Sequence, residues 1–194
     1  MNERTLLIIK EDGLKRGLTG EILSRIEKAG LKIVAAKMIN ASTEKVKEHY
    51  KKDKEWHIKI GNYNLKDCKE FGLDVMEIYG SEDPEEIGRK VNEMLYDIFK
   101  NAPMLLFIFE GPNAVEKLRK LVGATYPIDA DPGTIRGDFG LDSPAVGLKS
   151  KRNVLNLVHA SGTVEEAEKE IDIWFEKDEI CDNYGRCDTA VYGY

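Results

Sequence analysis

Four short, mainly apolar stretches stand out along the chain, separated by stretches whose apolar residues recur at helical spacing. Residues 5–10 read Thr-Leu-Leu-Ile-Ile-Lys, which is the length of a buried strand and ends in a basic residue. Comparable apolar runs cover residues 31–39, 103–109 and 154–158. We therefore predict four buried strands, with Lys10 at the tip of the first.

The stretches between these runs carry helix signals. Residues 20–29 place their apolar side chains on one helical face and are followed by a glycine, a typical stop. Ser42 and Thr163 suit the N-cap positions of two further helices, and residues 111–122 have the pattern of another. The order of elements predicts an α+β fold, a ferredoxin-like sandwich in which helices cover a four-stranded antiparallel sheet.

Two segments fall outside this minimal pattern. Residues 62–102 form an added region, in which Ser81-Glu82-Asp83-Pro84 begins a helix with a single apolar face. Residues 140–152 contain proline, glycine and lysine and predict an exposed connection. At 194 residues, the whole chain is predicted to be one domain, 1–194, with these two insertions.

The net charge disfavours a general nucleic-acid-binding protein. Asp and Glu outnumber Lys and Arg by 35 to 29, giving −6, so any anion site must be a local concentration of basic groups. No apolar run approaches the ~20 residues that span a bilayer. Three cysteines lack the spacing of a zinc site and suggest reduced thiols. With no signal-peptide pattern at residues 1–4, these features predict a cytoplasmic protein without a membrane or specific nucleic-acid partner.

His159 is the first candidate for chemistry, because it ends an apolar strand just before a predicted helix. Loop N–H groups and a helix N-terminus there favour a bound anion such as phosphate. The simpler interpretation is a histidine that only closes a strand. Arg136 lies in a stiff loop, residues 126–139, that contains two prolines, and it can present a planar fork to phosphate oxygens. The simpler interpretation there is a solvated loop arginine.

Four motifs taken together identify a family. They are Ile9-Lys-Glu-Asp-Gly13, Leu121-Val-Gly-Ala-Thr125, Pro132-Gly-Thr-Ile-Arg-Gly-Asp-Phe139 and Asn156-Leu-Val-His-Ala-Ser161. In this order, and on matching strands and helices, they resemble the nucleoside diphosphate kinases. The resemblance covers nearly all of the chain outside the two added segments.

The resemblance implies transfer of the γ-phosphoryl group from a nucleoside triphosphate to a nucleoside diphosphate, by a ping-pong mechanism through phospho-His159. It implies nucleotide-binding roles for a set of cationic and polar residues: Lys10, Arg119, Thr125, Arg136 and Asn156. It implies supporting roles near the histidine for Tyr50, Ser161 and Glu170. Mg²⁺ is expected to bridge the β- and γ-phosphates, held by nucleotide and water rather than by protein ligands. A homo-oligomer, a hexamer or smaller, is also expected.

Several points stay open from the sequence. The residue that stacks on the base is Ile58, by ungapped counting from Tyr50, or Trp56, the nearest aromatic side chain. His49 and His57 lack a surrounding motif and are interpreted as surface or structural residues. Two other functions compete with the kinase interpretation. One is a catalytically weak nucleotide-binding regulatory module on the same fold, and the other is a scaffold whose added helix recruits a partner.

Overall fold

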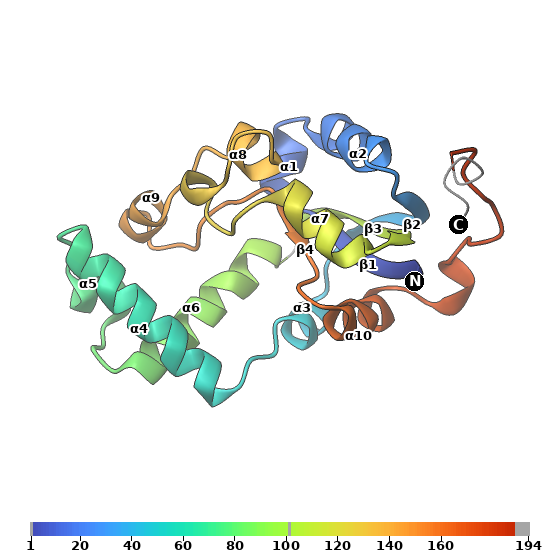
Figure 1. Cartoon of the computed structure of the whole chain (residues 1–194). Coiled ribbons are helices and arrows are strands. Elements are labelled where there is room, and N and C mark those ends of the chain that lie inside the picture. The colour runs from blue at the N-terminus through green and yellow to red at the C-terminus, as the bar shows by residue number, and fades with distance from the viewer. Residues whose placement is uncertain (1, 101, 189–194) are drawn as a thin grey trace.

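The fold is built on one antiparallel sheet (Figure 1). The computed structural model describes residues 2–100 and 102–188. Its strands lie in the order β2-β3-β1-β4, with the bounds β1 Asn2–Ile9, β2 Lys32–Asn40, β3 Pro103–Pro112 and β4 Val158–Ala160. All three neighbouring pairs are antiparallel. This arrangement confirms the predicted α+β sandwich.

Both faces of the central strand β1 are buried, and this follows from its sequence. Leu6 and Ile8 point into one hydrophobic cluster, and Leu7 and Ile9 point into a second, as the two-residue period of a strand requires. All four side chains have no exposed surface. A strand that is apolar without alternation therefore indicates a sheet covered on both sides.

Helices surround the sheet and also form a separate lobe (Figure 1). The helices are α1 Glu11–Lys15, α2 Thr19–Lys28, α3 Thr43–His49, α4 Lys54–Glu70, α5 Val75–Tyr79, α6 Pro84–Phe99, α7 Ala114–Val122, α8 Ile135–Phe139, α9 Pro144–Lys149 and α10 Val164–Trp174, with 3₁₀ turns at Pro127–Asp129 and Lys177–Glu179. Residues of α3 and α10 pack on one face of the sheet, and residues of α2 and α7 on the other. None of the described helices is both long enough and apolar enough to cross a membrane.

The lobe consists mainly of α4 and α6, which pack closely at two glycines. A Cβ atom on Gly61 would lie 1.8 Å from the Pro84 carbonyl oxygen, and one on Gly88 would lie 2.0 Å from the His57 carbonyl oxygen. Only glycine therefore allows this approach of the two backbones. The lobe has its own hydrophobic cluster, which includes Cys68, Tyr79, Ile87, Val91 and Leu148.

Three segments differ from the sequence prediction. The fourth strand is Val158–Ala160 rather than 154–158, because Leu157 has a left-handed backbone with φ of 69° that ends regular pairing before it. The segment 140–152 is not simply an exposed connection, since it contains α9 and Leu148 is buried in the lobe. The loop 126–139 includes a 3₁₀ turn and α8, whose Ile135 is buried in a sheet cluster.

Candidate active site

His159 lies at the middle of the short edge strand β4, opposite Ile8 of β1. Its Nε2 atom is 2.9 and 3.0 Å from the two carboxylate oxygens of Glu170. An ionised carboxylate only accepts hydrogen bonds, so Nε2 carries the proton and donates. In the neutral ring, the lone pair is then on Nδ1.

Glu170 is fixed by a second donor as well as by His159. The Ser161 hydroxyl donates to Glu170 Oε2 at 2.6 Å, and the same hydroxyl oxygen accepts the Leu6 N–H of β1 at 3.2 Å. Glu170 comes from α10, whose first turn is capped by Thr163 through the Glu166 N–H. Sheet and helix thus meet at one carboxylate.

Burial of Glu170 would raise its pKa, but its polar neighbours outweigh burial. The hydrogen bond and charge of His159, the nearby His49 and the Ser161 hydroxyl lower the pKa of Glu170 to about 2. Glu170 is therefore ionised throughout the physiological range, which keeps Nε2 of His159 protonated.

His49 is a member of this site that the sequence interpretation missed. Its side chain is fully buried, and its ring centroid lies 4.6 Å from that of His159. Trp174 Nε1 donates to His49 Nδ1 at 3.0 Å, while His49 Nε2 lies 3.7 Å from Glu170 Oε1 and is buried without a hydrogen bond. Of the two interpretations made from the sequence, surface or structural, the burial of His49 contradicts the first. The signal that could have found it is its place next to Tyr50, which the family resemblance had selected.

These buried groups predict acid sensitivity of the fold. Burial and the adjacent His159 lower the pKa of His49 from 6.5 to about 3, and the pKa of Glu170 falls from 4.5 to about 2. Both pKa values are depressed in the folded state, so the unfolded chain binds more protons in acid. The free energy of unfolding therefore has its full value above about pH 6.5. Below this pH it decreases because His49 is protonated in the unfolded chain, and below pH 4.5 protonation of Glu170 in the unfolded chain decreases it further.

Urea unfolding between pH 8 and 4 should show this loss. In His49→Gln the decline between pH 6.5 and 4.5 should be shallower, whereas His57→Gln, which changes a half-exposed histidine of α4, should follow the wild-type curve. Identical slopes for all three proteins would contradict the assigned role of His49.

A second group of residues links Lys10, Asn156 and Thr125. Lys10 Nζ donates to Asn156 Oδ1 at 2.7 Å, and Asn156 Nδ2 donates to the Thr125 carbonyl oxygen at 2.8 Å. Burial, together with the charge of Arg136, lowers the pKa of Lys10 to about 7 against the opposing effect of Asp12. A bound phosphate would stabilise the ammonium form of Lys10, so the lysine becomes fully protonated when an anion binds.

Leu157 supplies the turn that connects the two groups of residues. Its left-handed φ of 69° is unusual for a bulky side chain and stores backbone strain. Asp12 holds the turn by accepting the Leu157 N–H at 2.9 Å, and the Leu157 carbonyl accepts the Lys10 N–H at 2.8 Å. The strained residue thus fixes Asn156 and His159 relative to the end of β1.

Arg136 is buried, and its fork mainly contacts the main chain rather than open solvent. Nε donates to the Asn156 carbonyl at 3.1 Å and one terminal nitrogen donates to the Val158 carbonyl at 2.7 Å. The other terminal nitrogen donates to the Gly123 and Ala124 carbonyls at 3.1 and 3.2 Å. The fork expected to face phosphate oxygens is therefore largely occupied, and in this structure Arg136 ties two loops to β4.

The remaining predicted residues differ in their surroundings. Tyr50 is buried with its ring centroid 5.9 Å from that of His159, and burial, assisted by the charge of Glu170, raises its pKa well above the usual value. Arg119 is exposed near the end of α7, and its side chain makes no hydrogen bond or ion pair with the described residues. Burial, with a smaller contribution from the charge of Arg119, lowers the pKa of Arg136 to about 10.

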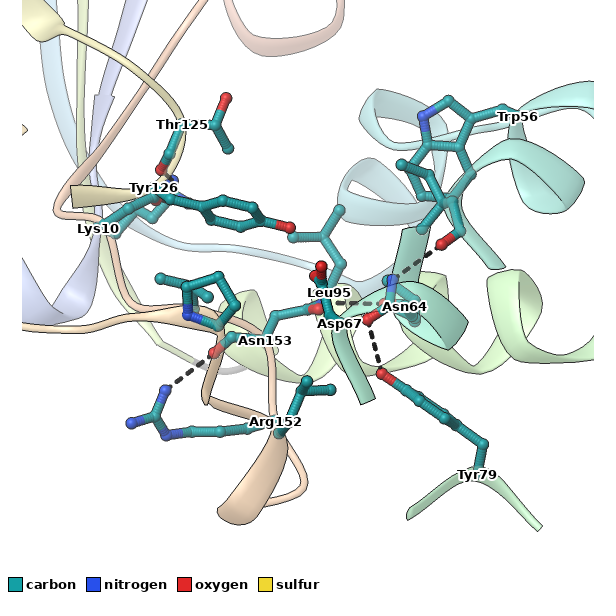
Figure 2. Close-up of a pocket in the computed structure, with 16 residues that line it drawn as sticks. Lys10, Trp56, Asn64, Asp67, Tyr79, Leu95, Thr125, Tyr126, Arg152 and Asn153 are labelled. Carbon is teal, nitrogen blue, oxygen red and sulfur yellow. Dashed lines mark hydrogen bonds between the residues drawn. The ribbon is translucent and has the colours of Figure 1, made fainter. Parts of the chain in front are cut away.

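A cavity of about 170 Å³ opens between the lobe and the sheet (Figure 2). Lys10, Thr125 and Asn156 lie in its wall, and the other lining residues include Trp56, Ile60, Asn64, Asp67, Tyr79, Val91, Leu95, Tyr126, Arg152 and Asn153. A cavity of roughly 150 Å³ admits a benzene ring, so there is room for an aromatic ring. Trp56 lines this cavity, whereas Ile58 does not.

A sequence model described as nucleoside diphosphate kinase matches residues 3–60 and 73–180, which include every residue of the two hydrogen-bonded groups. The chain belongs to the nucleoside diphosphate kinase family. The family match is interrupted only at residues 61–72, a shorter stretch than the predicted insertion 62–102, and this stretch begins inside α4.

Relatives in the nucleoside diphosphate kinase family match nearly the full chain. The nucleoside diphosphate kinase of Pyrobaculum aerophilum is 47% identical over 92% of this chain and 97% of its own length, and that of Saccharomyces cerevisiae is 33% identical over 93% and 90%. A crystal structure of an NDP kinase from Pyrobaculum aerophilum superposes with a TM-score of 0.90 and 45% sequence identity. The superposition covers 94% of this chain and 100% of that chain. The structure of a Borrelia burgdorferi nucleoside-diphosphate kinase, a transition-state mimic with bound vanadate and ADP, superposes with a TM-score of 0.76 and 35% sequence identity. That superposition covers 98% of this chain and 96% of the other.

Proposed function

We propose that this chain is a nucleoside diphosphate kinase that moves the γ-phosphoryl group of a nucleoside triphosphate to a nucleoside diphosphate through phospho-His159. The observation that carries this proposal is the pairing of His159 Nε2 with the ionised Glu170, which leaves Nδ1 as the free ring nitrogen. Family membership supports the same activity.

In the first half-reaction, the Nδ1 lone pair of His159 attacks the γ-phosphorus. The bond between that phosphorus and the oxygen bridging to the β-phosphate breaks, and the nucleoside diphosphate leaves with the electron pair. In the second half-reaction, a terminal oxygen of an acceptor diphosphate attacks the phosphohistidine and the ring recovers its lone pair. Glu170 retains the hydrogen bond from Nε2 and stabilises the positive charge that develops on the ring.

Phosphates are proposed to bind beside Lys10, Thr125, Asn156, Arg119 and Arg136. Phosphoryl transfer is mainly a matter of positioning and charge stabilisation, and buried Lys10, already oriented by Asn156, suits both. The remaining N–H capacity of Arg136 and the exposed Arg119 add positive potential.

Mg²⁺ is proposed as the cofactor, held by phosphate oxygens and water. The group of three side chains that could ligate a metal within the described ranges is His49, His159 and Glu170, and two of these are imidazoles, which suit zinc or copper better than magnesium. The residues present therefore fit a cation carried on the nucleotide. Such a cation neutralises charge on the phosphates.

A labelled intermediate tests this function. Incubation with γ-labelled ATP and Mg²⁺ should transfer label to the protein in an acid-labile, base-stable form, as expected of a phosphohistidine, and an added nucleoside diphosphate should remove it. The label should be absent from His159→Ala and present in His57→Ala. Persistence of the label in His159→Ala would contradict the proposal.

Trp56 is proposed to contact the base, because it lines the cavity that also contains Lys10 and Asn156. Stacking of a base on an aromatic ring contributes about 1–3 kcal/mol by alanine substitution. Trp56→Ala should therefore raise KM for the nucleotide by roughly tenfold with little change in kcat. Ile58→Ala, on the same helix but outside the cavity, is the matched control, and an equal rise in both variants would refute the assignment.

We further propose a homo-oligomer, a hexamer or smaller, working in the cytoplasm on nucleotides, with no membrane or specific nucleic-acid partner. Support for a reducing compartment comes from Cys68, Cys181 and Cys187, which are free thiols. Light scattering at micromolar concentration measures the assembly, and a monomer would contradict it.

A further inference from the structure

The lobe contributes polar side chains to the cavity, and two of them lie outside the family match. Asn64 and Asp67 both come from residues 61–72 and line the cavity together with Tyr79. In Figure 2 they lie across the cavity from Lys10 and Thr125. The turns of α4 that lie outside the family match therefore face the part of a nucleotide that extends away from phosphates bound at Lys10.

Asn64 is already engaged by protein partners. Its Oδ1 accepts the Tyr79 hydroxyl at 2.8 Å, and its Nδ2 donates to the Ile60 carbonyl at 2.9 Å. This network fixes the orientation of the Asn64 amide, which keeps one N–H and one oxygen lone pair for a ligand.

Asp67 is the polar group that lacks a partner. Its side chain is half-buried at the cavity, and it makes no hydrogen bond or ion pair with any residue of the described segments. The two cations that line the cavity are bonded elsewhere, Lys10 to Asn156 and Arg152 to Asp142. Water can solvate this half-exposed carboxylate in the free protein, but a ligand that fills the cavity displaces that water, and its own donors must then replace the lost hydrogen bonds.

The chemistry of the bases narrows the choice of ligand. A carboxylate accepts two hydrogen bonds side by side and matches a ligand with two adjacent N–H donors. Guanine offers this pair at N1 and its 2-amino group. Adenine and cytosine place a ring acceptor next to their amino group, hypoxanthine lacks the 2-amino group, and the N–H of uracil and thymine lies between carbonyls.

We propose that Asp67 accepts hydrogen bonds from N1–H and the 2-amino group of guanine, so that this enzyme favours guanine nucleotides. The inference rests on the proposed function, because it places the phosphates at Lys10 and the base in the cavity that Asp67 lines. The Tyr126 ring also lines the cavity and extends from the side of Lys10 and Thr125 toward Leu95 (Figure 2). Hydrogen bonds to an edge that only guanine carries distinguish guanine nucleotides from the others, whereas stacking alone accepts every base.

The test is the second half-reaction, measured separately for each acceptor. Enzyme phosphorylated by ATP is mixed with GDP, IDP, ADP or XDP at pH 8, and loss of the phosphoenzyme is followed in single turnovers. A good bidentate pair is worth about 1–3 kcal/mol, so the second-order rate constant for GDP should exceed those for ADP and IDP by roughly tenfold.

Asp67→Asn provides a gain of function that a purely structural role would not produce. An amide donates one hydrogen bond and accepts the other, which matches xanthine, where a carbonyl replaces the 2-amino group. The rate constant for GDP should fall roughly tenfold and that for XDP should rise, while that for ADP, which also reports folding, stays within twofold. Glu70→Gln is the matched control, because it removes the same charge from an exposed position of α4 and should leave the wild-type order.

The outcomes separate this inference from the proposed function. If no diphosphate removes the label, the phosphotransfer function itself fails. If all diphosphates do so at equal rates, or if ADP is preferred by the wild type, the function stands and the role of Asp67 is overturned. Equal acceptor profiles for the wild type and Asp67→Asn overturn it in the same way.

Discussion

His159→Ala should lower kcat by about 10⁴-fold or more, because removal of a catalytic nucleophile typically has effects of that size or larger. His159 stands at the edge of the sheet with its Nε2 atom committed to Glu170, and the adjacent His49 is fully buried. Nucleotide affinity should change little, since Lys10 and Asn156 stay in place. A coupled assay gives kcat, and calorimetric titration gives Kd.

His57→Ala, which changes the half-exposed histidine of α4, should retain wild-type turnover and is the control. Turnover that survives in His159→Ala would mean direct transfer between two bound nucleotides. A wild-type enzyme as slow as the variant, with intact nucleotide binding, would identify the catalytically weak regulatory module that the sequence also allows.

Arg136→Lys should destabilise the fold by about 3 kcal/mol and lower kcat more than tenfold. The guanidinium joins the carbonyls of Gly123, Ala124, Asn156 and Val158, and a single ammonium group lacks the geometry to reach them all. Buried carbonyls then lose their donors, and the main chain on both sides of the Leu157 turn loosens. Urea unfolding and steady-state kinetics measure the two effects.

Arg119→Lys is the matched control for stability, because the Arg119 side chain is exposed and forms no hydrogen bond with the described residues. Its free energy of unfolding should stay within about 0.5 kcal/mol of the wild type. If Arg136→Lys is equally stable, the main-chain contacts contribute nothing and the account of Arg136 as a tie between loops and strand is wrong. A stable variant with low kcat would instead assign Arg136 to direct phosphate contact.

The sheet could be predicted because its central strands β1 and β3 are apolar on both faces, and Leu6 to Ile9 carry that signal without ambiguity. The helix α4 was not predicted, because its buried contact surface includes Gly61 and the small Cys68, whereas Tyr63 is exposed. A periodicity of large apolar residues does not mark a helix that packs through a glycine.

Within the site, motif order selected the residues around His159, but the backbone determined how they meet. No rule on sequence assigns a left-handed conformation to a leucine, so the turn at Leu157 and the short β4 could not be foreseen. Arg136 shows the same limit, since its sequence context does not distinguish a phosphate from four main-chain carbonyls as its partner. His49 lacked a motif of its own.

The hydrophobic cluster of the lobe has a consequence for how this enzyme can diversify. Tyr79, Ile87 and Leu148 pack in the lobe, whereas the strands that carry Lys10 and His159 belong to the two sheet clusters. Substitutions in α4 and α5 can therefore change the wall of the cavity proposed for the base without shifting His159. Selection, in nature or in the laboratory, can alter which nucleotides are accepted while the transfer chemistry is inherited intact.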